Sequence, residues 1–136
     1  MQDWKIAEKQ FEAHWAQYGK RAWVHRFSDT AEAIGINGAG TIAAAQPSDY
    51  LVVHDGLTFL AEVKHSADKT SFSHKGIRPM QFACARKSVP AGGQFLFFIK
   101  SKALNKWFCV PASVIINNRE TKSTKWSDIL QYEWTI

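Results

Sequence analysis

The stretch that decides the fold reads QPSDYLVVHDGLTFLAEVK and spans residues 46–64. It contains two largely apolar runs, residues 48–54 and 57–64, which are separated by Asp55-Gly56. Asp-Gly between such runs is the strongest short-range signal of a β-hairpin, because both residues accept the backbone angles of a tight two-residue turn. The sequence therefore predicts a hairpin whose register is set by its turn.

That register brings two acidic residues together. We expect His54 to face Leu57 across the turn, and counting back along both strands then places Asp49 opposite Glu62. Side chains alternate along a strand, so Asp49, Glu62 and Lys64 share one face. Facing Cβ atoms lie about 5 Å apart, where two carboxylates repel each other unless a divalent cation lies between them. A metal site with an adjacent ammonium is one interpretation, and a solvated salt-bridge cluster is the other.

The remaining pattern predicts one α/β domain over residues 1–136, of which 46% are hydrophobic. Both faces of the hairpin are largely apolar, which favours a mixed central sheet covered by helices on both sides. The first helix is expected at residues 3–18, and Pro79 opens another that runs to about Ser88. The other expected elements are strands at residues 21–27, 94–100 and 107–110, a polar loop at residues 66–76, and a short helix after Pro111.

Charge and cysteine content narrow the class of protein. The net charge of +5 fits a polyanionic partner such as nucleic acid. No apolar run approaches the ~20 residues that cross a bilayer, and no signal peptide is visible, so we expect no membrane partner. Cys84 and Cys109 lack the spacing of metal ligands, and we expect reduced thiols in a cytoplasmic protein.

The order of short motifs resembles a known nuclease superfamily. Pro47-Ser48-Asp49 followed by Glu62-Val63-Lys64 looks like the pattern that gives the PD-(D/E)xK nucleases their name. With KTSF at residues 69–72 and IRPMQ at residues 77–81, the series is similar to the RecU-type Holliday junction resolvases of bacteria and their phages. The match covers about residues 46–110.

This resemblance implies a restriction-endonuclease-like core and a nicking endonuclease that uses Mg²⁺ or Mn²⁺. Asp49 and Glu62 would be the metal ligands, and Lys64 would position the attacking water or stabilise charge. Members of the superfamily often add a glutamine from the helix after the hairpin, which Gln81 matches. The resemblance thus assigns catalytic roles to residues on both sides of the hairpin.

Superfamily members also often add a glutamate from the first helix, and two residues are candidates for it. We expect Glu12, because Phe11-Glu12 matches the Phe-Glu of the resolvases. Glu8 is the alternative, because helical periodicity turns it closer to the apolar stripe of this helix. Either acid would act beside Asp49.

A basic loop and helix follow the second strand of the hairpin, with only Asp68 opposing their charge. We expect them to flank the active site and bind phosphates on either side of the cleavage point. Phe72 in this loop either stacks at a DNA branch point or packs into the core, and we expect the core. The candidate DNA-binding residues are Lys69, Ser71, His74, Lys75, Arg78, Arg86 and Lys87.

The resemblance implies branched DNA, above all the four-way junction, as substrate. Two symmetric nicks would require a two-fold homodimer, acting in the cytoplasm of a bacterial or phage-infected cell. The resolvases carry a long stalk between their first core strands, and the corresponding residues 28–46 are few and glycine-rich here, so any stalk is much reduced. The alternatives are a related endonuclease for flaps, nicks or recognition sequences, and a non-catalytic DNA-binding module.

Overall fold

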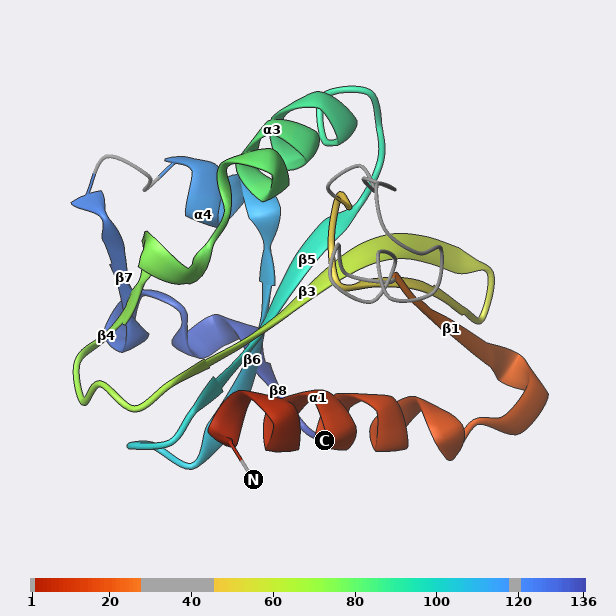
Figure 1. Ribbon diagram of the computed structural model, residues 1–136, viewed down its shortest axis with the longest axis horizontal. Coiled ribbons are helices and arrows are strands. Elements are labelled where there is room, and N and C mark those ends of the chain that lie inside the picture. The colour runs from red at the N-terminus through yellow and green to blue at the C-terminus, as the bar shows by residue number, and fades with distance from the viewer. Residues whose placement is uncertain (1, 28–45, 118–120) are drawn as a thin grey trace, which may run out of the picture.

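The computed structural model describes residues 2–27, 46–117 and 121–136, which surround one twisted central sheet (Figure 1). The described helices and strands are α1 (Asp3–Ala16), β1 (Ala22–Arg26), β2 (Tyr50–His54), β3 (Leu57–Ser66), β4 (Ser71–Ser73), α3 (Pro79–Ser88), β5 (Phe95–Ser101), β6 (Lys106–Pro111), α4 (Ala112–Asn117), β7 (Ser123–Lys125) and β8 (Glu133–Trp134). Short 3-10 turns occupy Gly19–Arg21, His74–Gly76, Trp126–Asp128 and Leu130–Tyr132.

The central sheet has the strand order β1-β2-β3-β5-β6-β8. β3 and β5 run parallel, while the other neighbouring strands of this sheet pair antiparallel. The sheet is therefore mixed, as the sequence predicted. A second, smaller sheet consists of β4 and β7.

The hairpin formed by β2 and β3 has the register that its turn predicts. Asp55 and Gly56 have φ angles of 48° and 85°, as a two-residue turn with positive φ at both positions requires. His54 pairs with Leu57, and Tyr50 pairs with Ala61. Extending that ladder by one residue brings Asp49 opposite Glu62, so the predicted register is confirmed.

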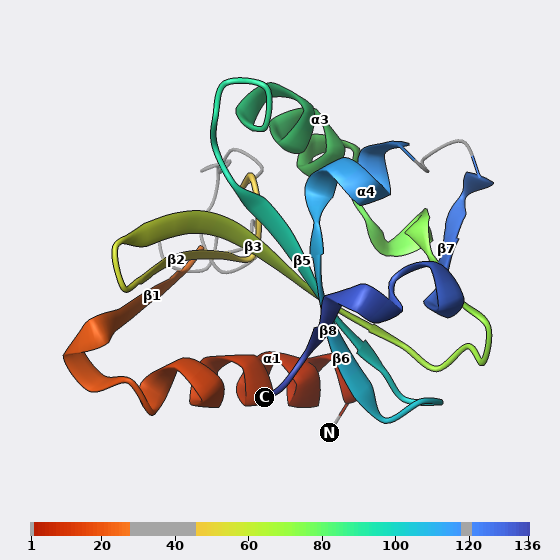
Figure 2. The same cartoon turned by 180° about the vertical axis from the view of Figure 1, so that it is seen from behind.

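Helix α1 covers one face of the sheet, as Figures 1 and 2 show from opposite sides. It ends at Ala16, earlier than expected, because the chain leaves the helix and turns at Gly19, whose φ is +57°. Phe11 is fully buried, and its ring centroid lies 4.9 Å from those of Tyr50 and Phe98. The apolar stripe predicted for this helix thus anchors it to β2 and β5.

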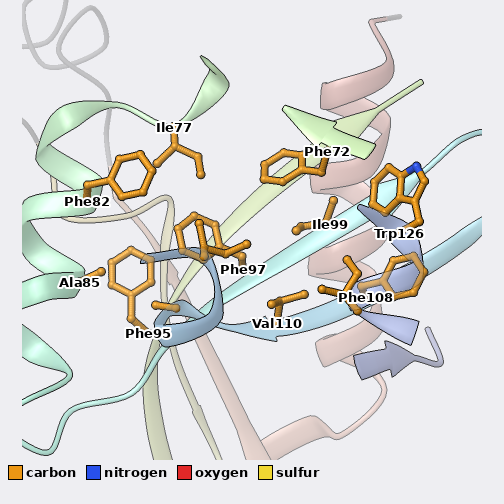
Figure 3. Close-up of a cluster of buried hydrophobic side chains, with 13 residues drawn as sticks. Phe72, Ile77, Phe82, Ala85, Phe95, Phe97, Ile99, Phe108, Val110 and Trp126 are labelled. Carbon is orange, nitrogen blue, oxygen red and sulfur yellow. The ribbon is translucent and has the colours of Figure 1, made fainter. Parts of the chain in front are cut away.

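Helices α3 and α4 cover the opposite face, along β5 and β6 (Figure 2). Figure 3 shows the core on this side, where Phe95, Phe97 and Ile99 of β5 meet Phe82 of α3. Phe98 points to the α1 side instead. A strand buried on both faces needs apolar residues at every position, which explains the continuous apolar run at residues 95–99 of the strand predicted at residues 94–100.

The prediction that residues 66–76 form only a loop is wrong. Its second half contains strand β4, which pairs with β7, and a 3-10 turn at His74–Gly76. The partner strand lies about fifty positions away in sequence, at Ser123–Lys125, so the local polar pattern gave no sign of it. Phe72 in β4 is 3% exposed and belongs to the α3-side core, which confirms the predicted core position.

Three further expectations concern the rest of the chain. Cys84 and Cys109 are both free thiols, as expected. Within the described residues, no helix is both long enough and apolar enough to span a bilayer. The reduced stalk suggested for residues 28–46 falls almost wholly on positions 28–45, which lie outside the described residues.

Candidate active site

A cleft of about 360 Å³ lies between α1, the end of β1, the entry to β2, the second half of β3 and the start of α3. We call it the central cleft. The antiparallel pairing of β1 with β2 brings Arg26 and Phe27 beside Asp49 at its wall. The residues that line the central cleft are Trp4, Glu8, Arg26, Phe27, Gln46, Ser48, Asp49, Val63, Lys64, His65, Gly76, Arg78 and Gln81.

Asp49 is held at the wall of the central cleft by the neighbouring strand. Its Oδ2 accepts a hydrogen bond of 3.0 Å from the backbone N–H of Val63. Ser48 is buried just before it and donates its hydroxyl to the carbonyl of Tyr50, which fixes the entry to β2. The Asp49 carboxylate therefore faces β3 in a defined position beside Glu62.

Glu62 lies beneath the cleft surface and is fully buried, with 0% exposure. Neither of its carboxylate oxygens has a hydrogen-bond partner among the described residues. Burial, followed by the adjacent Asp49 carboxyl group, raises the pKa of Glu62 far above its usual range, although Lys64 and Arg78 act in the opposite direction. A buried carboxylate without hydrogen bonds is costly for a fold, so this position favours a proton or nearby positive charge.

Lys64 links the acidic pair to the end of the 3-10 turn at His74–Gly76, which precedes α3. Its Nζ lies 3.6 Å from Glu62 Oε1 and donates a hydrogen bond of 2.7 Å to the carbonyl of Gly76. Its side chain is 17% exposed, so the amine is restrained while still lining the central cleft. The structure thus brings together the three groups that the hairpin register predicted.

The acidic pair fits a hard divalent cation. Mg²⁺ favours one or two carboxylates completed by water and phosphate oxygens. In residues 2–27, 46–117 and 121–136, no three Asp, Glu, His or Cys side chains gather into a ready-made metal cage. The unpartnered oxygens of Glu62 beside Asp49 therefore suit an ion that shares its coordination with solvent or a phosphate, rather than one enclosed by protein ligands.

The first helix offers Glu8, and not Glu12, to this cleft. The Glu8 side chain is 13% exposed and lies 3.6 Å from the guanidinium of Arg26. Burial first, and the Asp49 carboxylate second, raise the pKa of Glu8. Glu12 is exposed and lines a different hollow, beside Trp15. One turn of helix separates the two acids, and the geometry does not support the expectation that favoured Glu12.

Gln81 occupies the first turn of α3 and is 3% exposed. Its Oε1 accepts a hydrogen bond of 2.9 Å from the backbone N–H of Arg78, which closes the start of the helix behind Pro79. The guanidinium-bearing residue Arg78 is exposed and lines the central cleft with Gln81. The expected glutamine and one expected phosphate ligand therefore lie at the same end of α3.

Four of the other expected DNA-binding residues are exposed lysines and arginines, which fall into two groups. Lys75 is exposed beside Gly76, and Lys69 is exposed in the connection between β3 and β4. Arg86 and Lys87 are exposed in the last turn of α3, and neither lines the central cleft. The basic segment therefore extends beyond the cleft instead of gathering around it.

Two members of that list are held inside the protein. His74 is 6% exposed, and its Nε2 shares a hydrogen bond of 2.7 Å with Thr124 Oγ1 of β7. Ser71 is half-buried in β4, and its backbone N–H donates to Asp68 Oδ1. His74 does not offer its ring to solvent, because the unforeseen β4–β7 pairing encloses it.

Sequence reasoning gave Arg26 and His65 no role and placed Trp4 on the apolar stripe of the first helix, yet all three line the central cleft, and Trp4 is 48% exposed. Arg26 reaches it because β1 pairs with β2 in a register that sets Arg26 against Tyr50. The signal for that pairing was weak, since residues 28–46 separate the strands. His65 follows Lys64 on the opposite side of β3, where alternation turns it toward α1.

The mixed sheet, with α1 on one face and α3 and α4 on the other, is a restriction-endonuclease-like α/β fold, as the sequence predicted. A solved structure with a similar fold is the Holliday junction resolvase Hjc from the archaeal hyperthermophile Archaeoglobus fulgidus. The TM-score is 0.59, over 95% of this chain and 91% of that chain, at 14% sequence identity. No known family profile and no curated protein sequence matches the chain. The comparison therefore establishes the fold alone.

Proposed function

We propose that this chain is a metal-dependent DNA endonuclease whose leading substrate is branched DNA such as a four-way junction. The observation that carries the proposal is the group Asp49, Glu62 and Lys64 at the central cleft. Glu62 is buried 3.6 Å from the Lys64 ammonium, and its carboxylate has no hydrogen-bond partner among the described residues. The fold is shared with a protein described as a Holliday junction resolvase. The net charge of +5 supports a polyanionic substrate.

Asp49 and Glu62 would hold Mg²⁺ or Mn²⁺. A bound divalent ion of this kind polarises a phosphoryl oxygen and lowers the pKa of a water molecule. The chain's own groups would do the rest. Lys64, restrained by Glu62 and Gly76, would orient the attacking water or offset charge on the phosphate. Arg78, whose backbone is fixed by Gln81, would bind the phosphodiester at the cleft wall.

We assign the helix acid to Glu8. Its partly buried carboxylate interacts with Asp49 and is paired with Arg26, so it would adjust the charge near the metal ligands. Glu8→Gln should slow cleavage at least about tenfold, while Glu12→Gln, one turn further along the exposed side of α1, should leave it unchanged. The reverse result would restore the expectation drawn from Phe11-Glu12.

The assembly and substrate preference belong to the same proposal. A four-way junction has two equivalent strands to cut, so a two-fold homodimer would present two copies of the central cleft in matching orientation. The similarity of the sequence motifs to the RecU-type resolvases supports this choice. Lys69 and Lys75 extend the positive surface beyond the cleft and would contact the arms of the junction.

The decisive test is cleavage of labelled four-way junction, flap, nicked and linear duplex DNA with matched arms, in Mg²⁺, Mn²⁺ or EDTA. We expect metal-dependent nicking with preference for the junction. Asp49→Asn should lose at least about 10²-fold in rate while still binding DNA, since its loss weakens binding of the metal ion that would stabilise charge at the reacting phosphate. Glu133→Gln, an exposed acid on β8, is the matched control.

Each contrary outcome would indicate a different function for this chain. Equal cleavage of flap or linear DNA would indicate another type of endonuclease on the same fold. DNA binding without cleavage in either metal would indicate a binding module whose acids are structural. Equal cleavage by the wild type and Asp49→Asn would locate the chemistry outside the central cleft.

A further inference from the structure

A second hollow adjoins the central cleft. It measures about 160 Å³ and lies between the first half of α1, the end of β3 and the hairpin that joins β5 to β6. We call it the side hollow, and its polar lining residues are Asp3, Gln10, His65, Lys100, Lys102 and Asn105. His65 lines both hollows, so the two lie next to each other at that residue.

Strand pairing fixes the basic wall of the side hollow. His65 on β3 is the register partner of Lys100 on β5. The backbone N–H of Lys102 donates to the carbonyl of Ser66 at 2.9 Å, which holds the hairpin beside the end of β3. Lys100 Nζ donates to Asn105 Oδ1 at 2.9 Å across the same hairpin. Lys100 therefore lies on a strand, and Lys102 lies in a turn whose backbone is held against the end of β3.

These groups already hold one anion, the carboxylate of Asp3. Its Oδ2 lies 3.4 Å from Lys102 Nζ and 3.9 Å from His65 Nε2. Both contacts are long, and the Lys102 side chain is 64% exposed, so water and other anions reach it readily. Two lysines and a histidine face a single carboxylate, which leaves an excess of positive charge in the side hollow.

An exposed aromatic ring lies at the end of the central cleft near the side hollow, one residue after Asp3. Trp4 lines the central cleft, is 48% exposed, and follows Asp3 in the first turn of α1. Grooves that carry a nucleic acid strand combine cations that follow the backbone with aromatic rings on which bases stack. The Lys5 ammonium lies 5.3 Å from the centroid of the Trp4 ring, so a further cation lies at this end of α1. A solvated ion-pair cluster explains the lysines alone, but it does not explain why they adjoin a cleft that an exposed indole lines.

We propose that the side hollow is a phosphate subsite, which binds the phosphodiester backbone of the DNA strand as it leaves the central cleft past Trp4. This inference rests on the proposed nuclease function, because it needs a DNA strand in that cleft. Lys100 and Lys102 supply the charge, and Asp3 competes with the phosphate for Lys102 and His65. The subsite lies on the opposite side of β3 from the basic segment that contains Lys69 and Lys75.

The test measures how binding of a fluorescent four-way junction depends on salt, with Ca²⁺ replacing Mg²⁺ to limit cleavage. The paired variant Lys100→Gln/Lys102→Gln keeps hydrogen-bonding side chains but removes both charges. Its slope of log affinity against log salt concentration should fall by about two units, because each phosphate that a lysine neutralises adds about 0.9 to that slope. Lys106→Gln is the matched control on the same hairpin, because Lys106 is paired with Glu133 at 2.9 Å.

A complementary variant removes the competing anion. Asp3→Asn should bind the junction severalfold more tightly at low salt, and the gain should disappear when Lys100 and Lys102 are also replaced. Thermal unfolding of each variant checks that the fold is retained. An unchanged salt slope in a folded Lys100→Gln/Lys102→Gln protein overturns the subsite, as does an equal loss in Lys106→Gln.

Cleavage by the wild-type protein separates this inference from the proposed function. Metal-dependent cleavage with an unchanged slope in the double variant rejects the subsite and keeps the nuclease. A reduced slope without cleavage in Mg²⁺ or Mn²⁺ keeps the subsite as a DNA-binding surface and rejects the nuclease. If the wild type shows no salt-sensitive DNA binding, both are rejected.

Discussion

The two faces of the β2–β3 hairpin are built from alternate residues of the same strands, yet they differ in almost every property. Toward α1 lie Tyr50, Val52 and Ala61, all fully buried within a continuous apolar core. Toward the other side lie Asp49, Glu62 and Lys64, where a buried carboxylate lacks hydrogen-bond partners. The apolar face toward α1 stabilises the fold, whereas the buried carboxyl group on the other face lowers its stability.

This difference shows how a small domain places reactive groups accurately. Rigid packing on the α1 side holds the backbone of both strands, and the strand period of two then aims the acidic side chains at the cleft. The buried Glu62 carboxyl group, which lacks hydrogen bonds among the described residues, is tolerated because packing on the opposite face compensates for the loss of stability. Variants on the two faces should therefore have opposite signatures, with stability lost on one side and activity lost on the other.

The largest effect on stability is expected on the α1 face. Phe11→Ala should lower the free energy of unfolding by about 3–5 kcal/mol, because it leaves a cavity among the rings of Tyr50 and Phe98. Urea unfolding followed by tryptophan fluorescence measures the loss. Glu12→Ala, exposed on the same helix, is the control and should stay within about 0.5 kcal/mol of the wild type. A loss below about 1 kcal/mol would show that this ring cluster does not anchor α1.

On the polar face, Glu62→Gln should reverse that pattern. Cleavage should fall about 10²–10³-fold, equivalent to about 2.7–4 kcal/mol at the barrier. The free energy of unfolding without metal should stay equal or rise, because glutamine replaces a buried carboxyl group that has no hydrogen-bond partner among the described residues. Parallel cleavage and urea unfolding measurements provide both readouts. Destabilisation together with retained activity would mean that Glu62 serves the fold and not the chemistry.

A smaller effect concerns His74, another buried polar group, on the α3 side of the sheet. Burial lowers the pKa of His74, so the folded protein resists protonation of a ring that titrates near pH 6.5 when unfolded. The stability contributed by the neutral ring is complete above about pH 6.5 and is lost as the pH falls from there through the lower folded pKa. Acid should therefore weaken the fold.

The measurement is the change in thermal midpoint between about pH 7 and pH 5, compared between the wild type and His74→Gln. The variant keeps a partner for Thr124 and should show a shallower decline. His14, whose pKa is lowered by burial and by His54, remains in both proteins, so the difference between the two curves isolates His74. Identical curves would assign the acid sensitivity to other groups.

Local patterns predicted the parts of the site that depend on neighbouring residues. Asp55-Gly56 set the turn, and the turn set the pairing that brings Asp49 opposite Glu62. Pro79 marked the start of α3, whose first turn places Gln81 at the central cleft. In these cases a few adjacent residues contain the whole geometric information, because turn angles and strand alternation are short-range properties.

The choice between Glu8 and Glu12 shows where such reasoning stops. Both acids lie on one helix, and a motif match favoured Glu12, while only the docking of α1 against β2 and β3 turns Glu8 into the cleft. His74 was expected among the DNA-binding residues of a polar loop, and the pairing of β4 with β7 buries its side chain. Each outcome depends on contacts between segments far apart in the chain.

The sequence by itself determined the hairpin, its register, the face on which its acids and lysine lie, and the α/β class of the domain. Tertiary structure alone decided which helix acid joins them, that Arg26 reaches the cleft, and that a basic side hollow adjoins it. The physical reason is range. Turn angles and side-chain alternation act over a few residues, whereas a cleft exists only after packing has brought distant surfaces together.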